Sequence, residues 1–154
     1  MLTFIVGENS QGKSRYLKYL RSIVKGSRDL LEKSILDLPV DEASKQRLAL
    51  DGDAFELRCY EDKEDVSSIL SRLVRKTDLL LIDEIDSRLR VYEDACQLYY
   101  DIVEISRVRD VVAVTNDLQF IIQGDEFLEV NWNGETPVLT KVTLEEACEI
   151  LGGK

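Results

Sequence analysis

The sequence predicts an α/β fold in which a largely parallel sheet is flanked by helices and ends in a C-terminal antiparallel hairpin. Three observations lead to this prediction. Residues 2–6 form a short apolar run that leads into a glycine-rich turn and then into a helical pattern. Residues 79–83 form a continuous apolar run ending in an acid, a pattern typical of a strand buried on both faces of a parallel sheet. The dipeptide Asn133-Gly134 separates two further strand patterns, as in a hairpin turn.

The remaining elements follow in chain order. Apolar residues recur at helical spacing after the glycine-rich turn, which predicts a helix over residues 13–25 that ends at Gly26. Further helices are predicted over residues 27–36, 41–50, 65–75, 91–107, 118–123 and 144–151. Strands are predicted over residues 54–60, 111–115, 126–132 and 137–142. Asp41 is expected to cap the helix that it precedes, and Thr143 with Glu146 forms a capping-box pattern before the last helix.

Length and composition limit the classes of protein that the chain can be. Its 154 residues are the size of one domain, spanning residues 1–154, and 44% hydrophobic residues exclude a disordered chain. No 18-residue apolar run and no basic-then-apolar leader is present, so neither a membrane span nor a signal peptide is expected. The absence of histidine excludes histidine-based catalysis and metal binding. The three cysteines are widely spaced, which suits free thiols in a reducing cytoplasm rather than a disulfide framework.

The charge balance bears on possible partners. The chain has 30 acidic and 20 basic residues, and its formal net charge of -10 repels nucleic acid. Most of its basic stretches lie on predicted helices, where a solvated face is the ordinary explanation. Direct binding to nucleic acid is therefore disfavoured.

Residues 7–14, Gly-Glu-Asn-Ser-Gln-Gly-Lys-Ser, match the phosphate-loop pattern G-x-x-x-x-G-K-[ST] and lie between a predicted strand and a predicted helix. The glycines let the backbone curl so that its N–H groups face phosphate oxygens, and the helix N-terminus adds partial positive charge. In this pattern Lys13 reaches the β- and γ-phosphates, and the Ser14 hydroxyl ligates Mg²⁺. The sequence therefore predicts a P-loop NTPase that binds ATP with Mg²⁺. The residues expected to contact the nucleotide are Asn9, Ser10, Gln11, Gly12, Lys13, Ser14 and Arg15.

Two acids, Asp83 and Glu84, end the buried strand predicted before them. The first acid at such a strand end holds Mg²⁺, usually through water, and the second can act as general base toward the attacking water. The alternative is a cluster of acids at the N-terminus of the next helix. A glutamate at position 84 favours hydrolysis over phosphoryl transfer to a small acceptor, so a small-molecule kinase is disfavoured.

Four stretches of the sequence resemble the ABC-type ATPases, in particular their soluble branch of chromosome-maintenance (SMC), DNA-repair and OLD-like proteins. FIVGENSQGKS resembles the phosphate loop of that family, LLLIDEID its acidic strand, and VVAVTNDLQFI its switch strand. Residues 85–89, Ile-Asp-Ser-Arg-Leu, resemble the loop that follows the acidic strand, and the resemblance implies that Asp86 takes part in communication across a dimer. The family usually has Thr-His in the switch strand, and Asn116 stands at the place of that histidine. The resemblance implies catalytic roles for Glu84, Lys13 and Asn116, and Mg²⁺ ligation by Ser14 and Asp83.

The sequence also departs from the family pattern. It has no LSGGQ-like signature, the segment by which one subunit completes the γ-phosphate site of the other and stabilises transition-state charge. It begins on the phosphate-loop strand, whereas the family holds the adenine with strands that precede it. Asn116 can hydrogen-bond a phosphate or a water but cannot carry a proton. We therefore expect a minimal ABC-type ATPase with slow hydrolysis, unless a partner supplies the missing part.

The expected function is an ATP-gated switch that associates with itself as a homodimer or forms a complex with another ATPase or an effector such as a nuclease. The alternative is a non-catalytic, nucleotide-sensing regulator that binds a full-length ABC-type ATPase at its dimer face. Arg88 and Arg90 either contact phosphate across a dimer or form surface salt bridges. Trp132 either packs on an edge strand or anchors a partner.

Overall fold

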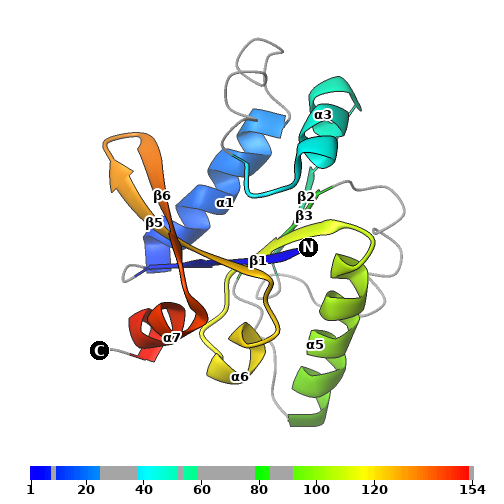
Figure 1. Ribbon diagram of the computed structural model, residues 1–154, viewed down its shortest axis with the longest axis vertical. Helices are drawn as coiled ribbons and strands as arrows, with labels where there is room; N and C mark the ends of the chain where they lie inside the picture. Colours follow the sequence, from blue (N-terminus) through cyan, green and yellow to red (C-terminus); the bar gives the residue numbers. More distant parts are fainter. Residues whose placement is uncertain (8–9, 25–37, 52–53, 59–78, 84–91, 153–154) are drawn as a thin grey trace.

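The computed structural model describes residues 1–7, 10–24, 38–51, 54–58, 79–83 and 92–152 (Figure 1). The strands are β1 (Leu2–Val6), β2 (Ala54–Arg58), β3 (Leu79–Asp83), β4 (Asp110–Ala113), β5 (Glu126–Asn133) and β6 (Thr136–Val142). The helices are α1 (Ser10–Val24), α3 (Glu42–Asp51), α5 (Tyr92–Ser106), α6 (Leu118–Ile121) and α7 (Leu144–Gly152). The strands form one sheet in the order β2-β3-β4-β1-β5-β6, with every neighbouring pair parallel except the antiparallel β5–β6 hairpin. The predicted α/β fold is confirmed.

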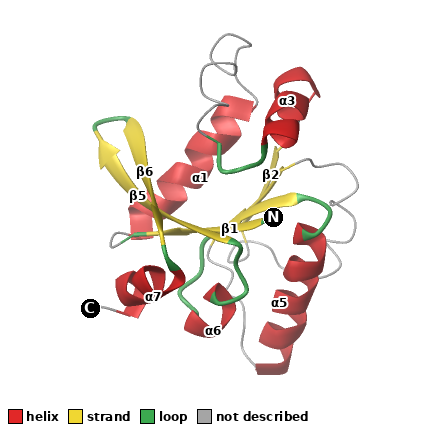
Figure 2. Cartoon of the chain, viewed as in Figure 1, coloured by secondary structure: helices red, strands yellow, loops and turns green. Residues whose placement is uncertain are grey.

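Helices cover both faces of the sheet (Figure 2). α1 and α3 pack on one face, and α5, α6 and α7 pack on the other. Because successive strand residues point to opposite faces, Phe4 belongs to the α5–α7 side of the core while Ile5 belongs to the α1 side. All five residues of β3 are buried, as its continuous apolar run predicted. None of the described helices combines the length and the apolar character that crossing a membrane requires.

Helix α1 begins earlier than the sequence pattern predicted. It starts at Ser10 rather than at residue 13, so its first turn includes Gly12 of the phosphate loop. The prediction rested on apolar periodicity, and the first apolar side chain of this helix is Tyr16. The polar first turn therefore gave no periodic signal, although it is helical.

The predicted caps are present. Asp41 Oδ1 accepts a hydrogen bond from the Ser44 backbone N–H at 2.7 Å. The Glu146 side chain accepts from the Thr143 N–H at 3.1 Å, and the Thr143 hydroxyl oxygen accepts from the Glu146 N–H at 3.2 Å, which forms a reciprocal capping box. The helices predicted over residues 27–36 and 65–75 lie outside the described residues.

The C-terminal hairpin has a two-residue turn. Asn133 pairs with Thr136 in the ladder, so the turn consists of Gly134 and Glu135 rather than of Asn133 and Gly134. Gly134 has a φ of 65°, a left-handed conformation that glycine adopts readily because it has no Cβ. Because β5 pairs in parallel with β1, this hairpin lies beside the strand that leads into the phosphate loop.

Gly124 lies between α6 and β5 at a point of close packing. A Cβ added there would lie 2.5 Å from Phe4 Cδ2 and 2.9 Å from Phe127 Cε1. Both rings are buried, and they stack at 6.3 Å between centroids with an interplanar angle of 9°. Neither ring can move aside without disturbing the core, so this position requires glycine.

We predict that Gly124→Ala lowers the free energy of unfolding by about 1–3 kcal/mol, because it overpacks the core. Chemical denaturation measures this change. Gly152→Ala is the matched control, since a Cβ there would meet only Leu118 Cδ1 at 3.9 Å. The control should change stability by less than about 0.5 kcal/mol. Equal stability of the two variants would contradict the packing described around Gly124.

Candidate functional site

Three segments that are distant in the sequence end at one edge of the sheet. β1, β4 and β3 run parallel, so their carboxyl ends lie at the same edge. β1 leads through Gly7 toward α1, β3 ends at Asp83, and β4 is followed by Thr115 and Asn116. In open α/β sheets, ligands bind outside the carboxyl ends of the strands. This edge therefore brings the predicted phosphate loop, acidic strand and switch strand together.

A direct contact joins the phosphate-loop helix to the acidic strand. Ser14 Oγ donates a hydrogen bond to Asp83 Oδ1 at 3.1 Å, although the two residues are 69 positions apart. The Asp83 side chain is almost fully buried, at 1% exposed. A buried carboxylate is costly unless hydrogen bonds or positive charge stabilise it. The Ser14 hydroxyl supplies one such hydrogen bond, which makes this pair the centre of the candidate site.

Lys13 is buried beside the same contact, with 3% of its surface exposed. A Cβ added at Gly7 would lie 3.7 Å from Lys13 Cγ and 3.4 Å from the Val130 carbonyl oxygen. The stem of the lysine, the start of the loop and strand β5 therefore meet closely around Gly7. This packing places the buried Lys13 side chain at the edge of the sheet where phosphate is expected.

The oxygen pair of Ser14 and Asp83 fits a Mg²⁺ ion. Mg²⁺ binds oxygen ligands at about 2.0–2.1 Å in octahedral geometry, so neighbouring ligand oxygens lie about 3 Å apart. The 3.1 Å between Ser14 Oγ and Asp83 Oδ1 matches that separation. One hydroxyl and one carboxylate also leave positions for phosphate oxygens and water, as Mg²⁺ prefers.

The residues around Asn116 hold the end of the switch strand. Asn116 is exposed and follows the buried Thr115, whose hydroxyl oxygen accepts a hydrogen bond from the Asp117 N–H at 3.0 Å. Asp117 caps α6 by accepting from the Gln119 N–H at 2.8 Å, and its other carboxylate oxygen accepts a hydrogen bond from the Tyr99 hydroxyl. Hydrogen bonds therefore restrain Thr115 and Asp117, the residues before and after Asn116.

Tyr99 connects this segment to helix α5. Its ring stacks on Phe120 of α6 at 4.0 Å between centroids, with an interplanar angle of 8°. Neither Tyr99 nor Asp117 is among the residues predicted for the site. An aspartate before an apolar helical stretch is an N-cap signal that could have identified Asp117, but nothing local pairs it with a tyrosine 18 residues earlier.

The hairpin contacts the phosphate loop directly. Trp132 Nε1 donates to the Gly12 carbonyl oxygen at 3.0 Å, and the Trp132 ring meets the Tyr19 ring edge-to-face at 6.1 Å. Arg15 Cζ lies 3.8 Å from the centroid of the Trp132 ring, and Arg15 Nη2 donates to the Gly134 carbonyl oxygen at 2.9 Å. These contacts support the packing alternative for Trp132. They also show that the Arg15 side chain lies against the hairpin.

Part of the predicted site lies outside the described residues. Asn9, Glu84, Asp86, Arg88 and Arg90 belong to that part. Ser10 and Gln11 belong to the first turn of α1, but their side chains also lie outside the described part. Their roles stay predictions. The structure brings Lys13, Ser14, Asp83 and Asn116 to one edge of the sheet, with Gly12 and Arg15 on the side of the hairpin.

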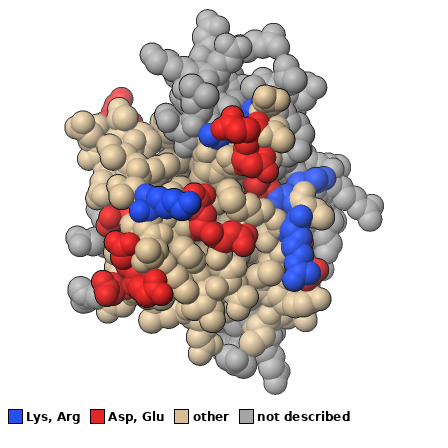
Figure 3. All heavy atoms as spheres, viewed as in Figure 1, with Lys and Arg blue, Asp and Glu red and all other residues tan. Residues whose placement is uncertain are grey.

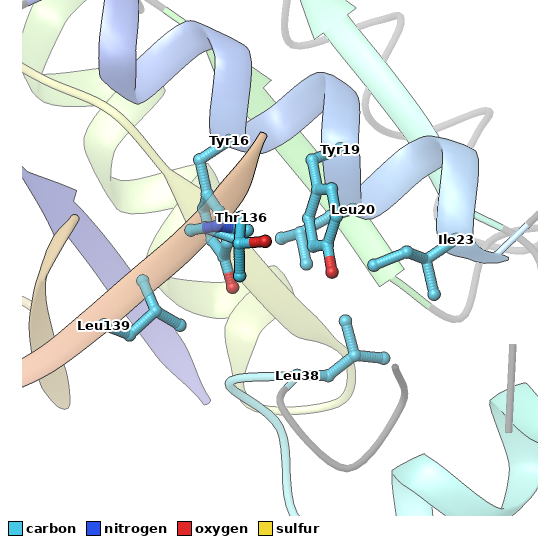
Figure 4. Close-up of a pocket in the computed structure, with 8 residues that line it drawn as sticks. Tyr16, Tyr19, Leu20, Ile23, Leu38, Thr136 and Leu139 are labelled. Carbon is cyan, nitrogen blue, oxygen red and sulfur yellow. The ribbon is translucent and has the colours of Figure 1, made fainter. Parts of the chain in front are cut away.

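A cavity of about 220 Å³ lies between α1 and strand β6 (Figure 4). Its lining is mainly apolar and aromatic and consists of Tyr16, Tyr19, Leu20, Ile23, Leu38, Thr136, Pro137 and Leu139. None of the predicted site residues contributes to that lining. The cavity is therefore separate from the phosphate-loop edge, although Tyr19 also contacts Trp132.

Comparison with known proteins identifies the fold. No family model and no curated protein sequence matches the chain. Among solved structures, the chain is similar to an RNase-L Inhibitor, with a TM-score of 0.61 and 12% identity, covering 96% of this chain and 39% of that one. It is equally similar to a chain in the complex of the archaeal ribosomal stalk protein aP1 with the archaeal ribosome recycling factor aABCE1, with a TM-score of 0.60 and 12% identity over 96% of this chain and 39% of that one.

The fold is similar to that of ABC-type P-loop ATPase domains. An Smc head domain with a coiled coil and joint from Pyrococcus yayanosii is a further match, with a TM-score of 0.47 and 19% identity over 74% of this chain and 19% of that one. The chain thus spans well under half the length of each of these structures. What it shares with the two better matches is the ABC-type fold.

We predict that Tyr99→Phe lowers the free energy of unfolding by about 1–2 kcal/mol, because it removes a hydrogen bond to a carboxylate and keeps the ring stack. Thermal and chemical denaturation measure this change. Tyr100→Phe on the same helix is the control: Tyr100 is 62% exposed, and its variant should change stability by less than about 0.5 kcal/mol. Wild-type stability of Tyr99→Phe would contradict the role assigned to this hydroxyl.

Proposed function

We propose that this chain is a Mg²⁺-dependent ATP-binding protein that hydrolyses ATP slowly and acts as an ATP-gated switch, with itself or with a partner effector such as a nuclease. The observation that carries this proposal is the 3.1 Å hydrogen bond between Ser14 Oγ and Asp83 Oδ1. It joins the last position of a complete phosphate-loop pattern to the acid that ends a buried parallel strand. The ABC-type fold supports nucleotide binding at the same edge.

Binding of the triphosphate would use the first turn of α1 and Lys13. The first N–H groups of a helix have no acceptor within the helix, so those of residues 10–13 can donate to phosphate oxygens. The Lys13 ammonium adds positive charge at the β- and γ-phosphates. Ser14 and Asp83 would hold Mg²⁺, which neutralises phosphate charge when bound.

Hydrolysis would use Glu84 as general base toward the attacking water, with Asn116 orienting that water or the γ-phosphate. Asn116 donates and accepts hydrogen bonds but cannot carry a proton, in contrast to the histidine that the family usually has at this position. The absence of an LSGGQ-like signature removes a further donor for transition-state charge. Turnover is therefore slow unless a partner supplies that donor.

Charge favours a protein partner over a nucleic acid. On the face drawn in Figure 3, the basic side chains of the described residues lie in separate groups, with acidic side chains near them. Together with the net charge of -10, this supports a second copy, another ATPase or an effector protein as partner. Cys96 and Cys148 are free thiols, which supports a location in the reducing cytoplasm.

The Glu84→Gln variant tests hydrolysis. It removes the proposed base while keeping the size of the side chain, so phosphate release should fall by at least about 100-fold. ATP affinity, measured by isothermal titration calorimetry, should stay within about threefold of wild type, because the base contributes to the chemical step rather than to binding. Light scattering should then show a larger particle with ATP than with ADP. The variant does not hydrolyse the bound ATP, so the γ-phosphate that gates association stays in place.

Glu145→Gln on the exposed side of α7 is the control and should turn over ATP as the wild type does. Equal phosphate release by wild type and Glu84→Gln would contradict the assignment of the base. ATP binding without turnover in either protein would favour the alternative motivated by the missing LSGGQ-like signature, a non-catalytic regulator of a full-length ABC-type ATPase. Co-purification of such an ATPase in the presence of ATP would then identify its target.

A further inference from the structure

The side chain of the residue that follows the phosphate-loop pattern is held by two contacts. Arg15 comes directly after Ser14 and is exposed. Its guanidinium lies against the Trp132 ring, with Cζ 3.8 Å from the ring centroid, and donates to the Gly134 carbonyl oxygen at 2.9 Å. A long exposed side chain ordinarily keeps most of its rotamer freedom. Two contacts on the hairpin instead hold this guanidinium in one place.

Two further contacts hold the Trp132 side chain in place. Its Nε1 donates to the Gly12 carbonyl oxygen at 3.0 Å, and Tyr19 meets its ring edge-to-face. The cavity that Tyr19 helps to line lies farther along α1, between this helix and β6 (Figure 4). The Arg15 guanidinium, which covers the Trp132 ring, is therefore the exposed layer of this stack.

The strand order gives the direction in which a bound nucleotide would lie. Asp83 and Asn116 come from β3 and β4, which lie on one side of β1. The γ-phosphate must face these residues if they act on it. The nucleoside end of the molecule then points to the other side of β1, where β5 and β6 carry Trp132 and Gly134. Arg15 lies on that side, one residue after the metal-binding serine.

We propose that the Arg15 guanidinium, supported by Trp132, is the stacking platform for the base of the bound nucleotide. This inference rests on the proposed function, since it requires a nucleoside triphosphate on the phosphate loop. A guanidinium is planar and stacks on aromatic rings, and nucleobases stack on arginine planes as well as on aromatic side chains. The ligand that the platform binds is the aromatic heterocycle of the nucleotide, the adenine ring in the case of ATP.

The test compares ATP with inorganic tripolyphosphate, which has the phosphates but no base. Isothermal titration calorimetry with Mg²⁺ measures both affinities for the wild type and for Arg15→Lys. Lysine keeps the positive charge but lacks the planar group, so ATP affinity should fall about tenfold, a loss typical for one stacked base. Tripolyphosphate affinity should stay within about twofold, since the charge near the phosphates is kept.

Arg107→Lys is the matched control, because Arg107 also presents an exposed guanidinium but lies after α5, where it pairs with Glu104. It should bind both ligands as the wild type does. Unchanged ATP affinity in Arg15→Lys, or an equal loss for ATP and tripolyphosphate, would overturn the platform. So would a wild type that binds the two ligands equally well, while the proposed function would survive. A wild type that binds neither ligand would overturn the proposed function together with this inference.

Discussion

The hydrogen bond between Ser14 and Asp83 depends on the order of strands in the sheet. β1 and β3 are not neighbours, because β4 lies between them, but all three run parallel and end at one edge. The start of α1 can therefore reach across the carboxyl end of β4 to the end of β3. The same order puts the end of β4, which leads to Asn116, between the ends of β1 and β3. Parallel pairing thus brings segments 69 residues apart to one edge, where the start of α1 completes the contact.

The phosphate loop is also held from its other side. Trp132 donates to the Gly12 carbonyl oxygen, and Ser14, two residues later, donates to Asp83. One turn of helix is therefore attached both to the hairpin and to the acidic strand. β6 lies at the edge of the sheet that the described strands form, and edge strands are often covered or shortened because their open backbone can pair with other chains. Here the hairpin that ends the sheet packs onto α1 and forms one wall of the candidate site.

Local signals made much of this architecture predictable from sequence. The apolar run of β3, the cap at Asp41 and the phosphate-loop pattern each specify a nearby structure, and each of these elements is present. The start of α1 was missed because its first turn has no apolar side chain to show a period. Contacts between distant segments were not predictable, because Trp132 and Gly12 are 120 positions apart and meet only through the pairing of β5 with β1. The link between Tyr99 and Asp117 was missed for the same reason, since it depends on how α5 packs beside α6.

The most direct test of the Ser14–Asp83 site measures ATP affinity with Mg²⁺ and with EDTA, for the wild type and for Asp83→Asn. If Ser14 and Asp83 hold the metal, Mg²⁺ should strengthen ATP binding by the wild type, and Asp83→Asn should lose at least about tenfold of that gain. In EDTA the variant should bind ATP as well as the wild type or better, because a negative charge beside the phosphates has been removed. An equal effect of Mg²⁺ on both proteins would contradict a metal site at this pair.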